Sequence, residues 1–326
     1  MSEDTKKFVK KAVFFLIILA IVFLLINQIY INNVFSKKQG TRKEVIYQDY
    51  IKSLQNKTIA YAFFGSSHVR DGIDPMYINS SFNLASSAES YVQTYYKLNR
   101  TLNKDKIKID YIFLELDMHT FSSILLRDSS VLADLENYHN YMTYQQIASL
   151  SHKSIPEIFL RTHFPVLGDG KSLFKKIEPT PIYLGWTENN NSFLTINRTE
   201  DVQERVDLHF KDQELISNLT LEYFQKTVLL AKENNLTIIF VKYPTSKEYN
   251  QELAKRGINK TQYYNIILSD LNKTTRNYKI LDYQESFFNH EDYFGDCDHL
   301  NSKGAEVLTK MIYQNLTLNT NNNKNH

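Results

Sequence analysis

A long apolar segment near the N-terminus is the feature that most constrains this chain. Residues 12–31, AVFFLIILAIVFLLINQIYI, carry no charge, and Asn27 and Gln28 are their strongly polar side chains. About 20 apolar residues are needed to cross the core of a bilayer as a helix. A buried helix of a globular domain is the alternative, but such helices are usually amphipathic, whereas this segment is apolar all round. No small-x-small cleavage site follows, so the sequence predicts an uncleaved signal anchor.

Basic residues flank this segment on both sides. Four precede it and four follow it: Lys6, Lys7, Lys10 and Lys11, then Lys37, Lys38, Arg42 and Lys43. The first four lie directly against the apolar run, and charges close to a span set its orientation. We therefore expect residues 1–11 to be a short cytoplasmic tail, residues 12–31 to contact membrane lipid, and the remaining chain to lie outside the cytoplasm on a single-pass cell-membrane protein. An inward-facing domain, such as a lipid esterase, is the alternative.

Segments with strand and helix patterns alternate beyond a polar juxtamembrane spacer at 32–56. Strands are predicted at 58–65, 81–85, 107–116, 236–243 and 278–283, and helices at 91–103, 215–233, 262–272 and 302–316. Such alternation is typical of a parallel sheet with helices on both faces. The predicted fold class is therefore α/β, in one domain over residues 57–318. The polar tail 319–326, NTNNNKNH, is predicted to be disordered.

Residues 118–210 lose this rhythm. They contain short helical patterns, several aromatic residues and the polar stretch WTENNNS. A long connection that follows the carboxyl end of a strand commonly forms a lid or a recognition surface. We expect this insertion to decide what is bound, rather than which chemistry is done.

The composition excludes several classes of function. The 38 basic residues are interspersed with 36 acidic ones, for a net charge of +2, so the sequence shows no basic stripe for nucleic acid. The one cysteine excludes an internal disulfide framework and a CxxC-type metal site. No organic cofactor or metal is expected.

A glycine and two serines follow the first predicted strand. Gly65 permits a tight turn after the apolar run TIAYAFF, and the turn presents Ser67 at the carboxyl end of a strand, where open α/β sheets build their sites. Ser67 is a candidate nucleophile whose own backbone N–H would help to bind an oxyanion. The alternative is that it caps the following helix.

The segment DCDHLNSKGAEVL near the C-terminus carries the complementary groups. Asp296 precedes His299 by three residues on a loop that leads into a helix, so it can orient Nδ1 and leave Nε2 free to accept a proton from a serine. Asp298 is the less favoured orienting acid, because a directly preceding side chain usually points elsewhere. A metal site is disfavoured, since consecutive ligands cannot easily surround one ion. Cys297, between two acids, is expected to have a raised thiol pKa and to be unreactive.

The blocks FFGSSH and FGDCDHLNSKGA together resemble the first and last sequence blocks of the SGNH/GDSL hydrolase superfamily. Within it, the N-terminal anchor, GSSH and NLASSAES are similar to DltD-like proteins of surface-polymer O-acylation. The resemblance implies a flavodoxin-like three-layer α/β/α sandwich and a triad of Ser67, Asp296 and His299. It also implies handling of acyl groups outside the cytoplasm, beside a membrane-bound O-acyltransferase.

Two blocks depart from the superfamily. Its second-block glycine, which donates an oxyanion N–H, is replaced within FNLASSAES, where Ser86 or Ser87 would have to donate. Its third-block asparagine is missing after YIFLELDMHTF, and Asp117 and His119 stand there instead. A carboxylate only accepts hydrogen bonds, whereas His119 can donate. Losing one oxyanion donor typically costs about a hundredfold or more in rate.

Three further side chains have two interpretations each. Arg70 could bind an anionic polymer or form a surface salt bridge, and Tyr243 could line an acyl pocket or end a strand. Trp186 could stack on a sugar ring, although packing within the insertion is favoured.

Two functional hypotheses follow. The first is a membrane-anchored serine acyltransferase or esterase acting on O-acyl groups of a cell-surface polysaccharide or teichoic-acid-like polymer. The second is a non-catalytic accessory subunit with the same fold, which binds glycan or a membrane-bound O-acyltransferase. The missing asparagine favours the second, because an incomplete oxyanion hole weakens catalysis.

Overall fold

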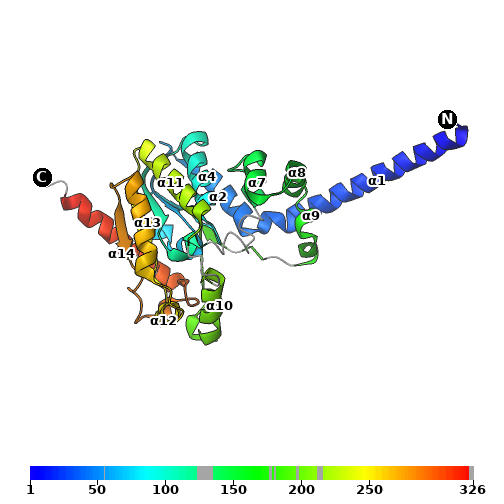
Figure 1. The fold of residues 1–326 in the computed structure, drawn as a ribbon. Coiled ribbons are helices and arrows are strands. Elements are labelled where there is room, and N and C mark those ends of the chain that lie inside the picture. The colour runs from blue at the N-terminus through cyan, green and yellow to red at the C-terminus, as the bar shows by residue number, and fades with distance from the viewer. Residues whose placement is uncertain are drawn as a thin grey trace.

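The computed structural model describes residues 1–54, 56–122, 135–175, 178–179, 181–195, 198–210 and 216–322. Helix α1 (Glu3–Asn33) projects away from an α/β domain (Figure 1). The side chain of Ser2 accepts a hydrogen bond from the backbone N–H of Thr5 and so caps the helix. The most apolar part of α1 has a mean hydropathy of 2.8 and is almost entirely exposed. By length and composition, this helix can cross a membrane.

The core of the domain is one five-stranded parallel sheet. Its strands are β1 (Thr58–Phe64), β2 (Ser81–Asn83), β3 (Lys108–Glu115), β6 (Thr237–Lys242) and β7 (Lys279–Asp282). They lie in the order β2-β1-β3-β6-β7, which is the flavodoxin-like order. All five predicted strands are confirmed. Because the strand order reverses between β1 and β3, a crevice is expected at their carboxyl ends.

Helices cover both faces of this sheet, as the alternating pattern predicted. Helices α4 (Tyr91–Asn99), α11 (Asn218–Glu233) and α13 (Lys260–Thr274) pack side by side (Figure 1). Helices α3 (Ser67–Gly72) and α14 (Ser302–Asn322) pack against each other. The remaining short elements outside the insertion are η2 (Pro75–Tyr77), the π-helical turn η3 (Arg100–Lys104), α12 (Lys247–Lys255) and η8 (Glu291–Tyr293).

Aromatic side chains fill the space between sheet and helices. Phe63 and Phe113 are partners across β1 and β3, and their rings stack with centroids 4.4 Å apart. Phe240 of β6 packs against Phe224 of α11. All four side chains are buried, and each such burial contributes about 1.5–3 kcal/mol.

The segment predicted as a polar spacer contains structure. After η1 (Phe35–Lys37), helix α2 (Gln39–Ser53) packs on the domain, and Tyr47 is 1% exposed. The Tyr47 hydroxyl donates to Asp105 at 3.1 Å, and its ring meets Phe82 of β2 edge-on. The ring of Tyr50 stacks on Phe82. The apolar residues of this segment recur at helical spacing, which is typical of a helix that packs on one face. By packing on β2, helix α2 links the end of α1 to the sheet.

The insertion consists of η4 (Met118–Phe121), η5 (Leu135–Tyr138), α7 (Tyr144–Ser151), α8 (Ile155–His163), α9 (Val166–Asp169), η6 (Gly170–Phe174), β4 (Ile182–Tyr183), β5 (Trp186–Thr187), η7 (Phe193–Thr195) and α10 (Arg198–Phe210). Its parts have different neighbours. Residues from α8 to η6 pack on α1, where Asn27 donates to the carbonyl of His163 at 3.2 Å. Helix α10 packs on α12.

Some predictions fall on residues outside the described ranges. They are position 55 of the spacer, positions 123–134, 176–177, 180 and 196–197 of the insertion, position 215 at the start of a predicted helix, and positions 323–326 of the tail. The first four residues of the predicted disordered tail belong to α14, which extends to Asn322.

Candidate active site

The turn after β1 presents Ser67 as predicted. Gly65 has a φ of +152°, a conformation that side chains disfavour. Ser66 caps α3 by accepting a hydrogen bond from the N–H of His68, so Ser67 is the first residue of that helix. A Cβ on Gly65 would lie 2.5 Å from Oε2 of Glu115, which sits on the neighbouring strand β3. The glycine is therefore required by both the turn and the close approach of β3.

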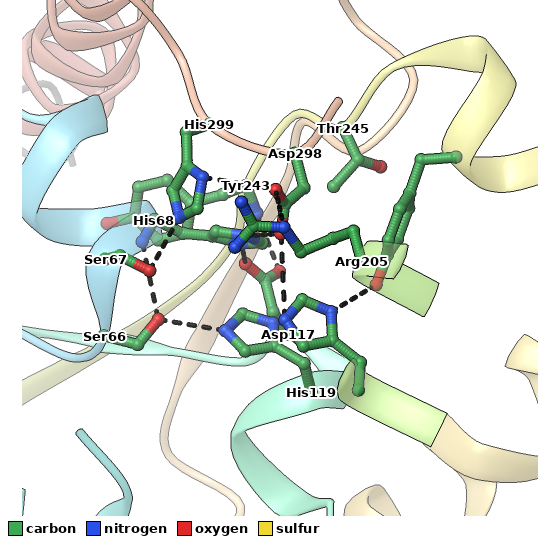
Figure 2. Close-up of polar contacts among 12 residues, drawn as sticks. Ser66, Ser67, His68, Asp117, His119, Arg205, Tyr243, Thr245, Asp298 and His299 are labelled. Carbon is green, nitrogen blue, oxygen red and sulfur yellow. Dashed lines mark hydrogen bonds and ion pairs between the residues drawn. The ribbon is translucent and has the colours of Figure 1, made fainter. Parts of the chain in front are cut away.

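The structure brings the three predicted triad residues together. Figure 2 shows Ser67 beside His299. The Nε2 atom of His299 lies 2.7 Å from Oγ of Ser67. Its Nδ1 atom lies 2.8 and 2.9 Å from the two carboxylate oxygens of Asp296. Asp296 also accepts a hydrogen bond from the backbone N–H of His299 at 2.8 Å, which fixes the loop between η8 and α14. This is the arrangement in which an oriented imidazole accepts a serine proton.

Asp298 does not point away from His299, contrary to the expectation for a directly preceding residue. Its Oδ1 atom lies 3.2 Å from Nδ1 of His299. It is 1% exposed and also contacts Nε2 of His68 and Nε of Arg205, each at 3.2 Å. Asp296 makes the shorter contacts, so His299 has two acidic neighbours rather than one.

These two acids set the protonation of the imidazole. Burial lowers the pKa of His299, but the negative charges of Asp298 and Asp296 outweigh burial and raise this pKa to about 9. At neutral pH the imidazole is therefore mostly protonated, and its neutral form, which can accept a proton from Ser67, is the minor one.

Helix α10 of the insertion stabilises the acidic loop. Arg205 contacts Oδ2 of Asp296 and Oδ1 of Asp298, both at 3.2 Å. Asp201 accepts the backbone N–H of Cys297 at 2.9 Å. Burial and then the neighbouring acids raise the pKa of the Cys297 thiol, which confirms the expectation for this cysteine. Arg205 is not predicted from the sequence, since nothing in its local pattern distinguishes it from other charged helix residues.

A second, fully buried polar network lies beneath Ser67. His68 places Nδ1 2.6 Å from Oδ2 of Asp117 and Nε2 3.2 Å from Oδ2 of Asp298 (Figure 2). Burial lowers the pKa of His68, but its hydrogen bonds to Asp117 and Asp298 raise it well above the usual value. The other oxygen of Asp117 accepts the backbone N–H of Tyr243 at 2.9 Å. Asp117 is thus a structural acceptor that joins β3, α3 and the end of β6.

Ser66, and not Ser67, contacts His119. The Ser66 Oγ atom lies 3.0 Å from Nε2 of His119 and 2.8 Å from Oε1 of Glu115. Burial, followed by the charge of Asp117, raises the pKa of Glu115 to about 8. Burial, followed by the charge of His68, lowers the pKa of His119 well below its usual value, so this ring is neutral. Because Nε2 of His119 is engaged with Ser66, it is not directed at an oxyanion on Ser67.

A cavity of about 490 Å³ opens beside Ser67, and Arg70, Ser87, His119 and Arg205 are among the residues that line it. The two serines proposed as second-block donors differ. The backbone N–H of Ser86 donates to the carbonyl of Gly65 at 3.2 Å and to Glu89, and Ser86 does not line this cavity. In the described part of the chain, no acceptor contacts the N–H of Ser87. Ser87 is therefore the better placed oxyanion donor.

The remaining candidates divide between cavity and core. Arg70 lines the cavity, but its guanidinium already binds both carboxylate oxygens of Asp71. Tyr243 is 2% exposed, packs on Gly72 and is not among the residues that line the cavity, so its position agrees with the strand-end interpretation rather than with an acyl pocket. The Trp186 indole is buried and donates to the carbonyl of Asp71 at 3.3 Å, in agreement with a packing role.

Two groups of side chains have spacing compatible with a metal ion. They are His68, Glu115, Asp117 and His119, and the set of His68, Asp298 and His299. Both nitrogens of His68 already contact carboxylates, and Asp117 also holds the N–H of Tyr243. An ion would have to replace these hydrogen bonds, so the arrangement fits a protonated histidine better than a metal.

The chain has little similarity to known proteins. No protein-family model matches the chain, and no curated protein matches it. Among solved structures, a GDSL-like lipase from Bacteroides thetaiotaomicron is similar with a TM-score of 0.39 and 11% identity, over 86% of this chain and 98% of that one. The finer resemblance to DltD-like proteins stays a prediction.

Proposed function

We propose that this chain is a membrane-anchored serine acyltransferase or esterase, in which Ser67 is the nucleophile, His299 the general base and Asp296 the orienting acid. One observation carries the proposal: Nε2 of His299 lies 2.7 Å from Oγ of Ser67, while Nδ1 is bound by Asp296. A side chain that only capped a helix would not need an oriented imidazole at its hydroxyl.

The chemistry proceeds by acyl transfer through the serine. Ser67 Oγ attacks the carbonyl carbon of an ester as its proton passes to Nε2 of His299. The tetrahedral intermediate then expels the alcohol, which takes this proton, and leaves an acyl ester on Ser67. An acceptor hydroxyl, from a polymer or from water, attacks the acyl carbon and gives its proton to Nε2. Release of Ser67 completes the cycle, and these steps use no cofactor.

The backbone N–H groups of Ser67 and Ser87 are the proposed oxyanion donors. Both residues line the cavity, and within the described residues neither N–H has an acceptor. With no third-block asparagine, the developing charge has fewer donors than in the superfamily this chain resembles. A slow reaction is the expected consequence.

The proposed site of action is the outer face of the cell membrane, on O-acyl groups of a surface polysaccharide or teichoic-acid-like polymer and beside a membrane-bound O-acyltransferase. Helix α1 supports anchoring, and the lysines before it support this orientation. Elements α9 and η6 support anchoring further, because they pack on α1 and expose the large apolar side chains of Leu167 and Phe174. The choice of a surface polymer as substrate and of an O-acyltransferase as partner is based on the sequence resemblance alone.

A fluorophosphonate probe tests the nucleophile, because it labels only activated serines. The full-length protein should be labelled, and Ser67→Ala and His299→Ala should each abolish labelling. Ser66→Ala is the matched control: it removes the neighbouring hydroxyl but leaves the triad, so the label should persist. Labelling that survives Ser67→Ala would remove Ser67 from the mechanism.

A non-catalytic accessory role is the second candidate. It is favoured by the engaged N–H of Ser86 and by the contact of His119 with Ser66, which together reduce the oxyanion donors. A folded wild-type protein that resists the probe, yet is required for polymer acylation in cells, would establish this role.

A further inference from the structure

A second cavity, separate from the Ser67 cavity, lies where the membrane helix meets the domain. It has a volume of about 530 Å³, within the range of about 300–1,000 Å³ that is typical of small-molecule sites. Phe35 and Lys38, directly after α1, line one side of it. Ser87 and Ala88 line both cavities, so the two meet at the loop that follows β2.

The walls of this cavity are amphipathic. Tyr47, Phe82 and Leu84 supply a buried apolar side, and Tyr138 and Tyr141 supply aromatic faces. Three lysines supply positive charge and Glu44, which pairs with Arg100, supplies negative charge. Two of the lysines have acidic partners. Lys38 pairs with Asp169, and Lys97 pairs with Glu89.

Lys43 differs from the other lysines. It is 7% exposed and lines the cavity from α2, yet the partner of its ammonium group is the backbone carbonyl of Ala85. No carboxylate among the described residues forms an ion pair with it. A buried ammonium without a counterion is costly, and an anion in the cavity would offset that cost.

We propose that this cavity binds an anionic amphiphile from the membrane surface, with its phosphate beside Lys43 and its apolar part against the half-buried rings of Phe35 and Tyr138. The position at the end of α1 favours a ligand that enters from the bilayer, and the shared loop at Ser87 would bring the ligand next to Ser67. The inference deepens the proposed function by naming an acyl-bearing substrate class, although binding itself requires no catalysis.

The charge of Lys43 supplies a specific signature. Burial, and then the charge of Lys97, lower the pKa of Lys43 well below its usual value. Glu89 and Asp71 act in the opposite direction, and Arg70 acts in the same one. A bound phosphate adds negative charge and raises the pKa of Lys43, so Lys43 should take up a proton when the anion binds.

Isothermal titration of the full chain in phosphatidylcholine nanodiscs tests the proposal. Dihexanoylphosphatidylglycerol should bind at least tenfold more tightly than its phosphatidylcholine analogue and than glycerol 3-phosphate. Titrations in two buffers of different ionisation enthalpy should show proton uptake. Equal binding of the two lipids would overturn the anion site, and equal binding of glycerol 3-phosphate would overturn the amphiphile in favour of a soluble phosphate compound.

Variants locate the site. Lys43→Met should weaken phosphatidylglycerol binding tenfold or more and remove the proton uptake, whereas Lys52→Met, on the exposed face of the same helix, should change neither. Val45 lines the cavity but is 55% exposed, so Val45→Trp should block binding without disturbing the core. Unchanged binding in both Lys43→Met and Val45→Trp would overturn the inference. Fluorophosphonate labelling of Ser67 should survive in both variants, so a failure of labelling in the wild type would count against the proposed function alone.

Discussion

The Oδ1 atom of Asp298 lies 3.2 Å from Nδ1 of His299, although the two residues are adjacent in sequence. The imidazole that contacts Ser67 therefore faces two carboxylates, since Asp296 also binds Nδ1. A single acid orients a histidine, whereas two acids in a buried site also hold it protonated. This second acid has a direct kinetic consequence.

Activity should rise with pH into the alkaline range. Because His299 must be neutral to accept the proton of Ser67 and its pKa is raised to about 9, kcat/KM for a soluble ester should increase about tenfold per pH unit below that value and then level off. Asp298→Asn removes one negative charge, so the rising limb should move toward lower pH. Rates measured between pH 6 and 10 check both expectations.

A surface aspartate provides the control for this pH profile. Asp292 pairs with the exposed Lys303, away from His299, so Asp292→Asn should leave the limb in place. A wild-type limb centred near the ordinary histidine value would contradict the two-acid description. So would a limb that Asp298→Asn fails to move in a folded protein.

Arg205 should be required for catalysis although it belongs to the insertion. Its guanidinium contacts both Asp296 and Asp298, so Arg205→Met leaves two close carboxylates without their shared cation. We expect kcat to fall roughly 10- to 100-fold with a small change in KM, because a displaced orienting acid affects the transition state more than binding. Arg205→Lys should restore part of kcat.

The matched control is Arg256→Met at the C-cap of α12, which removes an arginine paired with Asp207 and Glu252 at the surface. It should leave kcat unchanged. An Arg205→Met protein with wild-type kcat would mean that the acidic loop holds its geometry without α10.

Glu115 should make the fold less stable as the pH rises. Its pKa is raised to about 8 in the folded state, so the folded protein binds this proton more tightly than the unfolded chain does. The free energy of unfolding should therefore decrease from about pH 4.5 through pH 8. Glu115→Gln keeps a neutral, hydrogen-bonding side chain and removes this titration.

Thermal unfolding of the two proteins isolates the effect. At pH 9 the Glu115→Gln protein should be the more stable by roughly 1 to 3 kcal/mol, since one pKa unit corresponds to about 1.4 kcal/mol. At pH 5 the difference should be much smaller. A difference that does not depend on pH would show that Glu115 does not titrate in this range.

Gly65→Ala should abolish folding of the Ser67 turn. An added Cβ would lie 2.8 Å from Cβ of Glu115 on the adjacent strand, and the φ of +152° disfavours any side chain. Soluble yield and fluorophosphonate labelling should both be lost. Gly170→Ala is the control, because its Cβ would have no neighbour within 4 Å. Normal labelling of Gly65→Ala would contradict the described turn.

The sheet and the triad geometry were accessible from sequence because their signals are local. Each strand is a short apolar run that can be recognised locally. Once the strands are assigned to a parallel sheet, the end of β1 and the loop before α14 are expected at the same edge of that sheet. Ser67 and His299 each stand beside such a marker, a strand end and a helix start. Their proximity is confirmed, whereas their catalytic role remains a prediction.

The buried network and the role of the insertion were not accessible. His68 contacts Asp117 and Asp298, which are 49 and 230 positions away, and nothing in the blocks that contain His68 and Asp298 indicates that these side chains meet. Arg205 contacts the acidic loop because the long insertion folds so that α10 lies beside that loop. The hydrophobic periodicity of the sequence does not predict where such an insertion lies in space. The same applies to the packing of α9 and η6 on α1, which requires knowledge of these elements in space.

That packing leads to a prediction about the membrane. Phe23 and Asn27 lie within the predicted span, and they contact Phe164 and the carbonyl of His163 at the end of α8. If α1 crosses the bilayer, the apolar side chains of α8, α9 and η6 must lie at its interface, where Phe174 is 90% exposed. Burial of such apolar surface among lipid chains lowers the free energy of the system.

A nitroxide label at Phe174→Cys should therefore report a lipid environment. Cys297, the native cysteine, is buried and should not react with the label. In liposomes containing the full-length protein, molecular oxygen should relax the Phe174→Cys label more than a water-soluble nickel chelate does. A label at Ile266→Cys, an exposed apolar position on α13, should show the opposite order. If the two labels behave alike, the surface from α8 to η6 faces water or another protein, and α1 contacts the membrane without it.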